Sequence, residues 1–146
     1  MAKVLVVYCS LSGNTEAAAQ AVADGARSGG AEVVLKNASQ TEPKDLQACD
    51  AVALGSYDAF SYMGGAIKEF LDRSFYPTRD EVAGKPYVAF VTHGGCGRAI
   101  ASIESVATTF KFKKVAEPVL VKGRPDDQGM EQLKALGVRL AGAAKA

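Results

Sequence analysis

The sequence predicts an α/β fold with a doubly wound, five-stranded parallel sheet and helices on both faces. Three observations support this prediction: strand and helix patterns alternate along the chain, the strand patterns are continuous apolar runs, and the segments between them have apolar stripes at helical spacing. Apolar runs without in/out alternation indicate strands buried on both faces, as in a parallel sheet covered by helices. Strands separated by helices then imply right-handed crossovers and a doubly wound sheet.

The predicted strands consist mainly of β-branched and aromatic residues. They comprise residues 4–8, 33–35, 51–54, 87–91 and 119–121. The first helix is predicted from Asn14 to about Arg27, because small apolar residues share one of its faces, and Gly29 and Gly30 end it. Pro43 is suited to begin a short second helix. Further apolar stripes predict helices within residues 66–71, 99–110 and 130–140.

Length and composition indicate one soluble globular domain over residues 1–146. Hydrophobic residues make up 48% of the chain and charged residues 23%, as in ordinary folded proteins. The 17 Lys and Arg residues nearly balance the 16 Asp and Glu residues, which argues against a nucleic-acid partner. No apolar run is long enough for a signal peptide or a membrane span, so we expect a cytoplasmic protein with no membrane partner. Three cysteines without metal-like spacing and a single histidine predict no metal site.

The first predicted strand leads through a polar loop directly into the first helix. Three hydroxyls, one carboxamide and one glycine occur within it: the loop is Ser10, Leu11, Ser12, Gly13, Asn14 and Thr15. A helix start supplies free backbone N–H groups and a partial positive charge, and the hydroxyls can donate further hydrogen bonds to an anion. Such charge-assisted bonds are worth about 1.5–3 kcal/mol each, so no Lys or Arg is required. Capping the helix would need only one of these side chains, and the loop therefore predicts a phosphate site.

Other phosphate loops are excluded by residue type. A Walker loop ends in Gly-Lys-Ser/Thr and a Rossmann loop needs three spaced glycines, whereas this loop has only Gly13. A low-molecular-weight tyrosine phosphatase would have an arginine six residues after Cys9, where this chain has Thr15. A response-regulator receiver would have acidic residues after the first strand, where Cys9 and Ser10 stand.

Residues 7–16, Val-Tyr-Cys-Ser-Leu-Ser-Gly-Asn-Thr-Glu, resemble the phosphate-loop signature of the short-chain flavodoxins nearly residue for residue. The order of elements and the total length agree with that family across the whole chain. The resemblance implies the flavodoxin-like strand order 2-1-3-4-5 and FMN as the cofactor. It also implies phosphate contacts from the side chains of Ser10, Ser12, Asn14 and Thr15 and from the backbone amides of Leu11 and Gly13.

The family holds the flavin ring between the loops after the third and fourth strands, so the resemblance implies ring contacts in both. The first loop, residues 55–65, is rich in aromatic and small residues, as a flat ligand requires. Its candidate contacts are Ser56, Tyr57, Asp58, Ala59, Phe60 and Tyr62, and the sequence does not choose the stacking aromatic among them. The second loop, residues 92–98, has three glycines that free its backbone to hydrogen-bond the ring. Its candidates are Thr92, His93, Gly94, Gly95 and Gly97.

The chain departs from typical flavodoxins in its charge and its aromatic residues. Those proteins are strongly acidic and usually have a Trp in the first ring loop and a Tyr in the second, whereas this chain is nearly neutral, has no Trp and offers His93. His93 and Arg98 could stabilise an anionic reduced flavin or be ordinary surface residues, and Asp58 could bond the cofactor or only form a turn. The loops resemble more closely those of flavodoxin-like relatives of the quinone-reductase branch, although that branch's long insertion is absent.

Three functions are open at this point. The first is an FMN-binding redox protein for electron transport between partner proteins, with the chemistry supplied by the flavin and no catalytic residue of its own. The second is an NAD(P)H-dependent oxidoreductase that reduces quinones or other small-molecule acceptors, which the neutral charge favours slightly although no nicotinamide site is recognisable. The third is a non-redox module that binds an anion or a nucleotide. Both a monomer and a dimer are compatible with the sequence.

Overall fold

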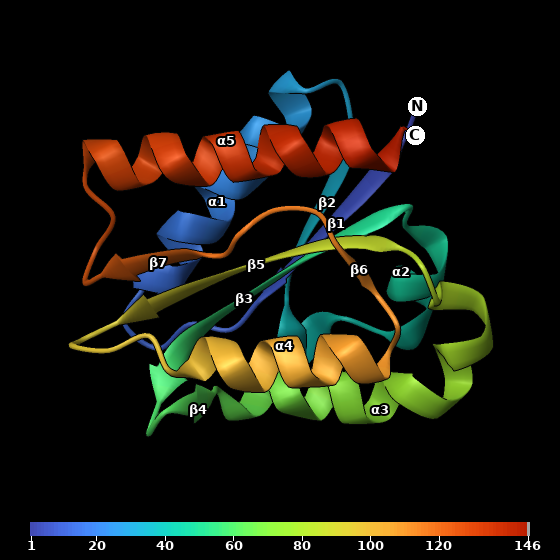
Figure 1. Cartoon of the computed structure of the whole chain (residues 1–146), viewed down its shortest axis with the longest axis horizontal. Helices are drawn as coiled ribbons and strands as arrows, with labels where there is room; N and C mark the ends of the chain where they lie inside the picture. The colour runs from blue at the N-terminus through green and yellow to red at the C-terminus, as the bar shows by residue number, and fades with distance from the viewer. Residues whose placement is uncertain (146) are drawn as a thin grey trace.

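The computed structural model describes residues 1–145 as alternating strands and helices (Figure 1). The strands are β1 (Lys3–Tyr8), β2 (Glu32–Asn37), β3 (Ala51–Ala59), β4 (Tyr62–Met63), β5 (Pro86–His93), β6 (Lys113–Lys114) and β7 (Val119–Lys122). The helices are α1 (Asn14–Ser28), the 3-10 turn η1 (Ala38–Gln40), α2 (Pro43–Ala48), α3 (Gly65–Val82), α4 (Ala99–Thr109) and α5 (Asp127–Ala144). Within residues 1–145, no helix is both long and apolar enough to cross a lipid bilayer.

The sheet has the order β2-β1-β3-β5. Strands β6 and β7 both pair with β5 on the side away from β3, β6 with the first residues of β5 and β7 with its last residues. All of these pairings are parallel, which confirms the predicted fold class and the order 2-1-3-4-5 when β6 and β7 are counted as the fifth strand. The fifth strand is interrupted between Lys114 and Val119, where Pro118 has no N–H to donate to a ladder. The short strand β4, which pairs antiparallel with the end of β3, was not predicted.

Helices α1 and α5 cover one face of the sheet, and α3 and α4 cover the other, with α2 at the side (Figure 1). Alternate residues of β1 enter different cores: Val4 and Val6 pack with α1 and α5, whereas Leu5 and Val7 pack with α2, α3 and α4. All four side chains are almost completely buried. The continuous apolar run of β1 therefore reflects burial on both faces, as predicted.

The carboxyl ends of the parallel strands meet at one edge of the sheet, on the left in Figure 1. The strand order reverses between β1 and β3, because the chain first adds β2 on one side of β1 and then returns to the other side. Ligands of doubly wound sheets bind outside such a reversal, at the carboxyl ends of the strands. The loops that follow β1, β3, β5 and β7 all lie at this edge.

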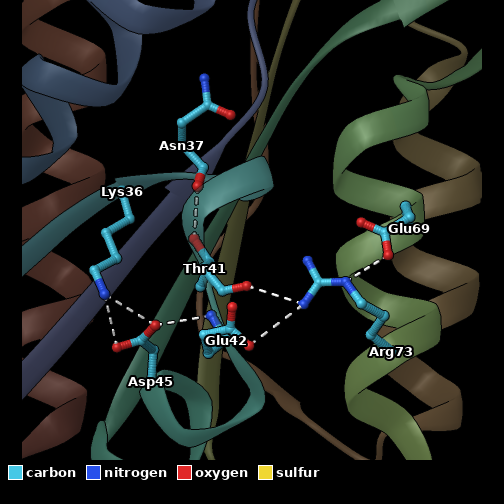
Figure 2. A network of polar contacts seen from close by, with 7 residues as sticks. All are labelled: Lys36, Asn37, Thr41, Glu42, Asp45, Glu69 and Arg73. Carbon is cyan, nitrogen blue, oxygen red and sulfur yellow. Dashed lines mark hydrogen bonds and ion pairs between the residues drawn. The ribbon is translucent and has the colours of Figure 1, made fainter.

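A polar network joins α2 to β2 and to α3 (Figure 2). Lys36 Nζ donates to both carboxylate oxygens of Asp45 at 3.0 and 3.1 Å, and the backbone N–H of Glu42 donates to the same carboxylate at 2.8 Å. Arg73 of α3 donates to the Thr41 carbonyl at 3.2 Å, pairs with Glu42 at 3.9 Å and pairs with Glu69. The network holds a short helix that few apolar contacts would fix, since Leu46 is its one fully buried side chain.

Replacing Asp45 with asparagine should lower the free energy of unfolding by about 1 kcal/mol at pH 7, because the ion pair with Lys36 is lost. Burial disfavours the charged carboxylate, but the Glu42 N–H and the Lys36 ammonium outweigh it and hold the pKa of Asp45 below its usual value. The stabilisation is therefore present above about pH 4 and is lost as the pH falls through the lowered pKa. Urea unfolding at pH 7 and pH 3 measures both values.

The control for Asp45→Asn is Asp72→Asn, which removes an exposed ion pair between Lys68 and Asp72 within α3. That variant should lose no more than about 0.5 kcal/mol at pH 7. An equal loss at pH 7 and pH 3 in Asp45→Asn would show that the ionised carboxylate does not stabilise α2.

Candidate functional site

The predicted phosphate loop lies between β1 and α1. Gly13 is the N-cap residue, with a left-handed φ of 95°, and no side chain of residues 1–145 hydrogen-bonds the first amides of the helix. The Ser10 hydroxyl accepts instead from the Gly13 N–H at 3.1 Å, which shapes the loop before the helix begins. The first-turn amides therefore remain available to an anion, and the capping explanation of this loop is wrong.

The side chains of the loop differ in their exposure. Leu11 and Ser12 are exposed, Asn14 is half-buried, and Thr15 is buried. The Thr15 and Thr92 hydroxyl oxygens lie 2.7 Å apart in a buried hydrogen bond. This bond joins the start of α1 to the end of β5, so Thr15 has a structural partner in addition to its predicted role at the phosphate. Thr92 is likewise a link between loops.

Cys9, at the end of β1, is buried, and burial raises the pKa of its thiol. Its Sγ lies 3.6 Å from the Ser56 hydroxyl oxygen. A buried neutral thiol is a poor nucleophile, which agrees with the exclusion of phosphatase chemistry. Cys49 is also buried, which raises the pKa of its thiol to about 11, whereas Cys96 is exposed.

The first ring loop is not the continuous loop predicted over residues 55–65. Strand β3 extends to Ala59, and a two-residue turn at Phe60 and Ser61 leads into β4. Both turn residues have positive φ, 57° and 69°, as in a type I′ hairpin, a turn that usually contains Asn and Gly. The prediction missed the hairpin because neither turn residue carries the usual signal. The residues of this segment that are predicted to contact the flavin ring therefore lie on or beside a two-stranded hairpin.

Hydrogen bonds tie the hairpin to the start of α4. One Asp58 oxygen accepts from the Ser61 N–H at 2.8 Å, and the other accepts from the Ala99 N–H at 2.8 Å. Ser102 accepts from the Met63 N–H at 2.9 Å. Asp58 therefore serves the turn and joins the two ring loops, with one hydrogen bond at each carboxylate oxygen. Ser102 was not predicted, because a serine inside a helix has no local signal for such a contact.

The aromatic candidates of the hairpin lie in different environments. Tyr57 is half-buried against the core on the α3 side, and burial raises the pKa of its phenol. Phe60 is completely exposed at the tip of the turn, and Tyr62 is 44% exposed. Phe60 and Tyr62 therefore have free ring surface for a ligand, and Tyr57 has less. Ala59 is half-buried in β3.

Ser56, the neighbour of Tyr57 in β3, is fully buried. Its hydroxyl donates to the Tyr57 carbonyl at 2.7 Å and accepts from the Gly64 N–H at 2.8 Å. Gly64 is also tightly packed, since a Cβ there would lie 2.6 Å from Cys9 Sγ. The Ser56 side chain thus supports the hairpin, and its contact with the cofactor stays a prediction.

The second ring loop begins at His93, the last residue of β5. The His93 carbonyl accepts from the Gly123 N–H at 2.8 Å, whereas its Nδ1 is buried and has no hydrogen-bond partner among residues 1–145. Gly94 and Gly95 are exposed and open, while a Cβ on Gly97 would lie 2.9 Å from the Leu120 side chain. Leu120 was not predicted as part of this surface. The unpartnered nitrogen and the open glycines suit a polar ligand edge.

The three predicted loops therefore converge at one edge, and the residues present fit an FMN group. Its phosphate would meet the uncapped start of α1 in the loop Ser10–Thr15. Its ring would lie between the hairpin at Phe60 and the loop at His93, where exposed aromatic surface and an unpartnered nitrogen occur. The individual cofactor contacts of the predicted residues, Ser56 and Asp58 included, stay predictions.

The fold and the site define an α/β nucleotide-binding protein with a phosphate loop at the reversal of strand order. Comparison with known proteins agrees: the flavodoxin family profile matches residues 6–137. The chain belongs to the flavodoxin family. Members of this family bind FMN, and FMN is the cofactor of this chain.

Three curated relatives of this chain have two different names. A flavodoxin of Aquifex aeolicus is 36% identical over 117 residues, which cover 77% of this chain and 63% of that protein. An NAD(P)H dehydrogenase (quinone) of Acidovorax ebreus is 32% identical over 149 residues, which cover 85% of this chain and 74% of that protein. A second NAD(P)H dehydrogenase (quinone), from Archaeoglobus fulgidus, is 36% identical over 97 residues, and this chain spans only 51% of its length.

Solved structures support the same fold. A flavodoxin from the domain Archaea superposes with a TM-score of 0.90 at 28% identity, over 99% of both chains. Rubredoxin oxygen:oxidoreductase from Desulfovibrio gigas superposes with a TM-score of 0.89 at 26% identity, but this chain covers only 36% of that protein. The fold therefore occurs both as a whole small protein and as part of larger ones.

Proposed function

We propose that this protein carries electrons between partner proteins through its bound FMN, as a single domain in the cytoplasm. The observation that supports this most directly is the set of three loops joined at one edge by the Thr15–Thr92 bond and the Asp58 contacts. The loops leave Phe60 and Tyr62 exposed beside the ring site, where a partner can approach. The flavin supplies the redox chemistry, and the chain supplies binding, orientation and access.

A second function, NAD(P)H-dependent reduction of a quinone or another small acceptor, is favoured by one observation. Relatives named NAD(P)H dehydrogenase (quinone) match up to 85% of this chain. The neutral charge is also compatible with a small-molecule substrate. The match to the flavodoxin family disfavours the third class, a non-redox anion-binding module.

The experiment that separates the two redox functions uses the FMN-loaded protein with NADH or NADPH and benzoquinone, followed by the absorbance of the nicotinamide. A carrier oxidises NAD(P)H no faster than the same concentration of free FMN, and it reduces a one-electron acceptor protein once it has been reduced chemically. Saturable turnover of NAD(P)H well above the free-FMN control would overturn the carrier proposal. A protein that does not retain FMN on gel filtration would contradict both.

A further inference from the structure

Two hydrogen bonds join the β3–β4 hairpin to the first turn of α4, and each is supported by a local bond. Asp58 accepts from the Ala99 N–H at 2.8 Å and, within the hairpin, from the Ser61 N–H at 2.8 Å. Ser102 accepts from the Met63 N–H at 2.9 Å and, within α4, donates to the Ala99 carbonyl at 2.7 Å. These four bonds form the hairpin–α4 contact, in which both backbone groups of Ala99 have partners.

The turn and β4 have few other contacts that would hold them in place. Residues 60–63 reach the rest of the described chain, residues 1–145, through one hydrogen bond outside the hairpin, that of Met63 to Ser102. Phe60 is completely exposed, whereas Met63 and Ala99 are buried and shielded from water. A buried N–H that loses its acceptor keeps its full desolvation penalty. The position of the hairpin tip therefore depends on the hairpin–α4 contact.

The loop on the opposite side of the predicted ring site is less constrained. Gly94, Gly95 and Cys96 are exposed and form no hydrogen bond with other residues of the described range, 1–145. A Cβ on either glycine would meet no atom within 4 Å. The loop ends where α4 begins, at Ala99. Because Ala99 also bonds the hairpin, the hairpin–α4 contact sets the separation between the two segments that would enclose the ring.

We propose that Ser102 is a positioning residue for the flavin ring. Through Met63 and Ala99, its hydroxyl keeps the β3–β4 hairpin at the separation from the loop of residues 93–98 that the ring needs. Without the hydroxyl, the Met63 N–H has no acceptor, the hairpin takes up other positions, and FMN binds only the molecules in which the hairpin lies in place. The inference goes beyond the electron-carrier proposal, because a carrier and a reductase need the same ring site.

The first test compares flavin binding by the wild-type apoprotein and by Ser102→Ala, from the quenching of flavin fluorescence on titration. We expect the affinities for FMN and for riboflavin to fall by the same factor, about tenfold, because both ligands contain the ring. The affinity for inorganic phosphate, from the chemical shifts of the Ser12 and Thr15 amides, should not change. Unchanged flavin affinities, a loss for FMN alone, or an equal loss for phosphate would overturn the proposal.

The matched control is Ser105→Ala, three residues further along α4, where the serine is exposed and its carbonyl, not its hydroxyl, accepts from Thr109. It makes the same change in helix propensity, and both flavin affinities should stay at the wild-type value. Ser102→Thr keeps a hydroxyl that can donate to the preceding turn, and it should recover most of the lost affinity. An equal loss in Ser105→Ala, or no recovery in Ser102→Thr, would contradict a role for this hydroxyl.

Amide hydrogen exchange of the apoprotein tests whether the hairpin itself moves. In Ser102→Ala the amides of Ser61, Met63 and Ala99 should exchange about tenfold faster, a larger increase than that of buried α1 amides, which report global unfolding. A common factor at all of these sites would show that Ser102 contributes only to global stability, and it would overturn the proposal. None of these measurements involves electron transfer, so a failure of the carrier function and a failure of this inference are distinguishable.

Discussion

Replacing Ser12 and Asn14 together with alanine should weaken FMN binding by about two orders of magnitude or more and leave riboflavin binding nearly unchanged. Two charge-assisted hydrogen bonds to the phosphate, at about 1.5–3 kcal/mol each, account for a loss of this size. Neither side chain is buried or has a hydrogen-bond partner of its own within residues 1–145, so their removal should not disturb the fold. Quenching of flavin fluorescence on titration into apoprotein gives both dissociation constants.

The choice of these two residues follows from the structure. Thr15→Ala would also break the buried bond to Thr92, and Ser10→Ala would also release the Gly13 N–H, so either loss would mix loop stability with phosphate binding. Thr15→Ser keeps the hydroxyl and should retain most of the affinity. Ser105→Ala, at an exposed position of α4, is the neutral control. A double variant that weakens FMN and riboflavin equally would place the phosphate elsewhere.

Gly137→Ala should lower the free energy of unfolding by about 3 kcal/mol, at the upper end of the usual cost of overpacking. Helices α1 and α5 approach each other so closely that a Cβ on Gly137 would lie 2.1 Å from the Val22 carbonyl oxygen. The contact is reciprocal, since a Cβ on Gly25 would lie 1.9 Å from the Lys134 carbonyl oxygen. Backbone atoms cannot rotate aside as side chains do, so the two helices would have to separate and open the core between them.

Urea unfolding at a fixed FMN concentration measures this loss, because bound cofactor contributes to stability by mass action. The matched control is Gly142→Ala, in the same helix at a position where a Cβ meets no atom within 4 Å. That variant should gain up to about 1 kcal/mol, since alanine favours the helix over glycine. A similar gain in Gly137→Ala would mean that α1 and α5 do not pack backbone against backbone.

Much of the fold was predictable from local patterns. The apolar run of β1 and the small-residue stripe of α1 indicate burial on two faces and on one face, respectively, and the structure confirms both. The loop Ser10–Thr15 indicates an anion site because its polar residues, its glycine and the start of α1 are contiguous in the chain. The hairpin at Phe60 was not predictable in this way, because its turn uses residues that rarely adopt positive φ.

The fold class and the family were predictable from the sequence, and the loop Ser10–Thr15 predicts a phosphate site, because each depends on residues that are close together in the chain. The partners that predicted site residues have within the fold are known only from the three-dimensional structure. Thr15 meets Thr92 and Asp58 meets Ala99 across 77 and 41 positions, respectively. Partners so far apart in sequence are set by strand order and register, which no local pattern encodes.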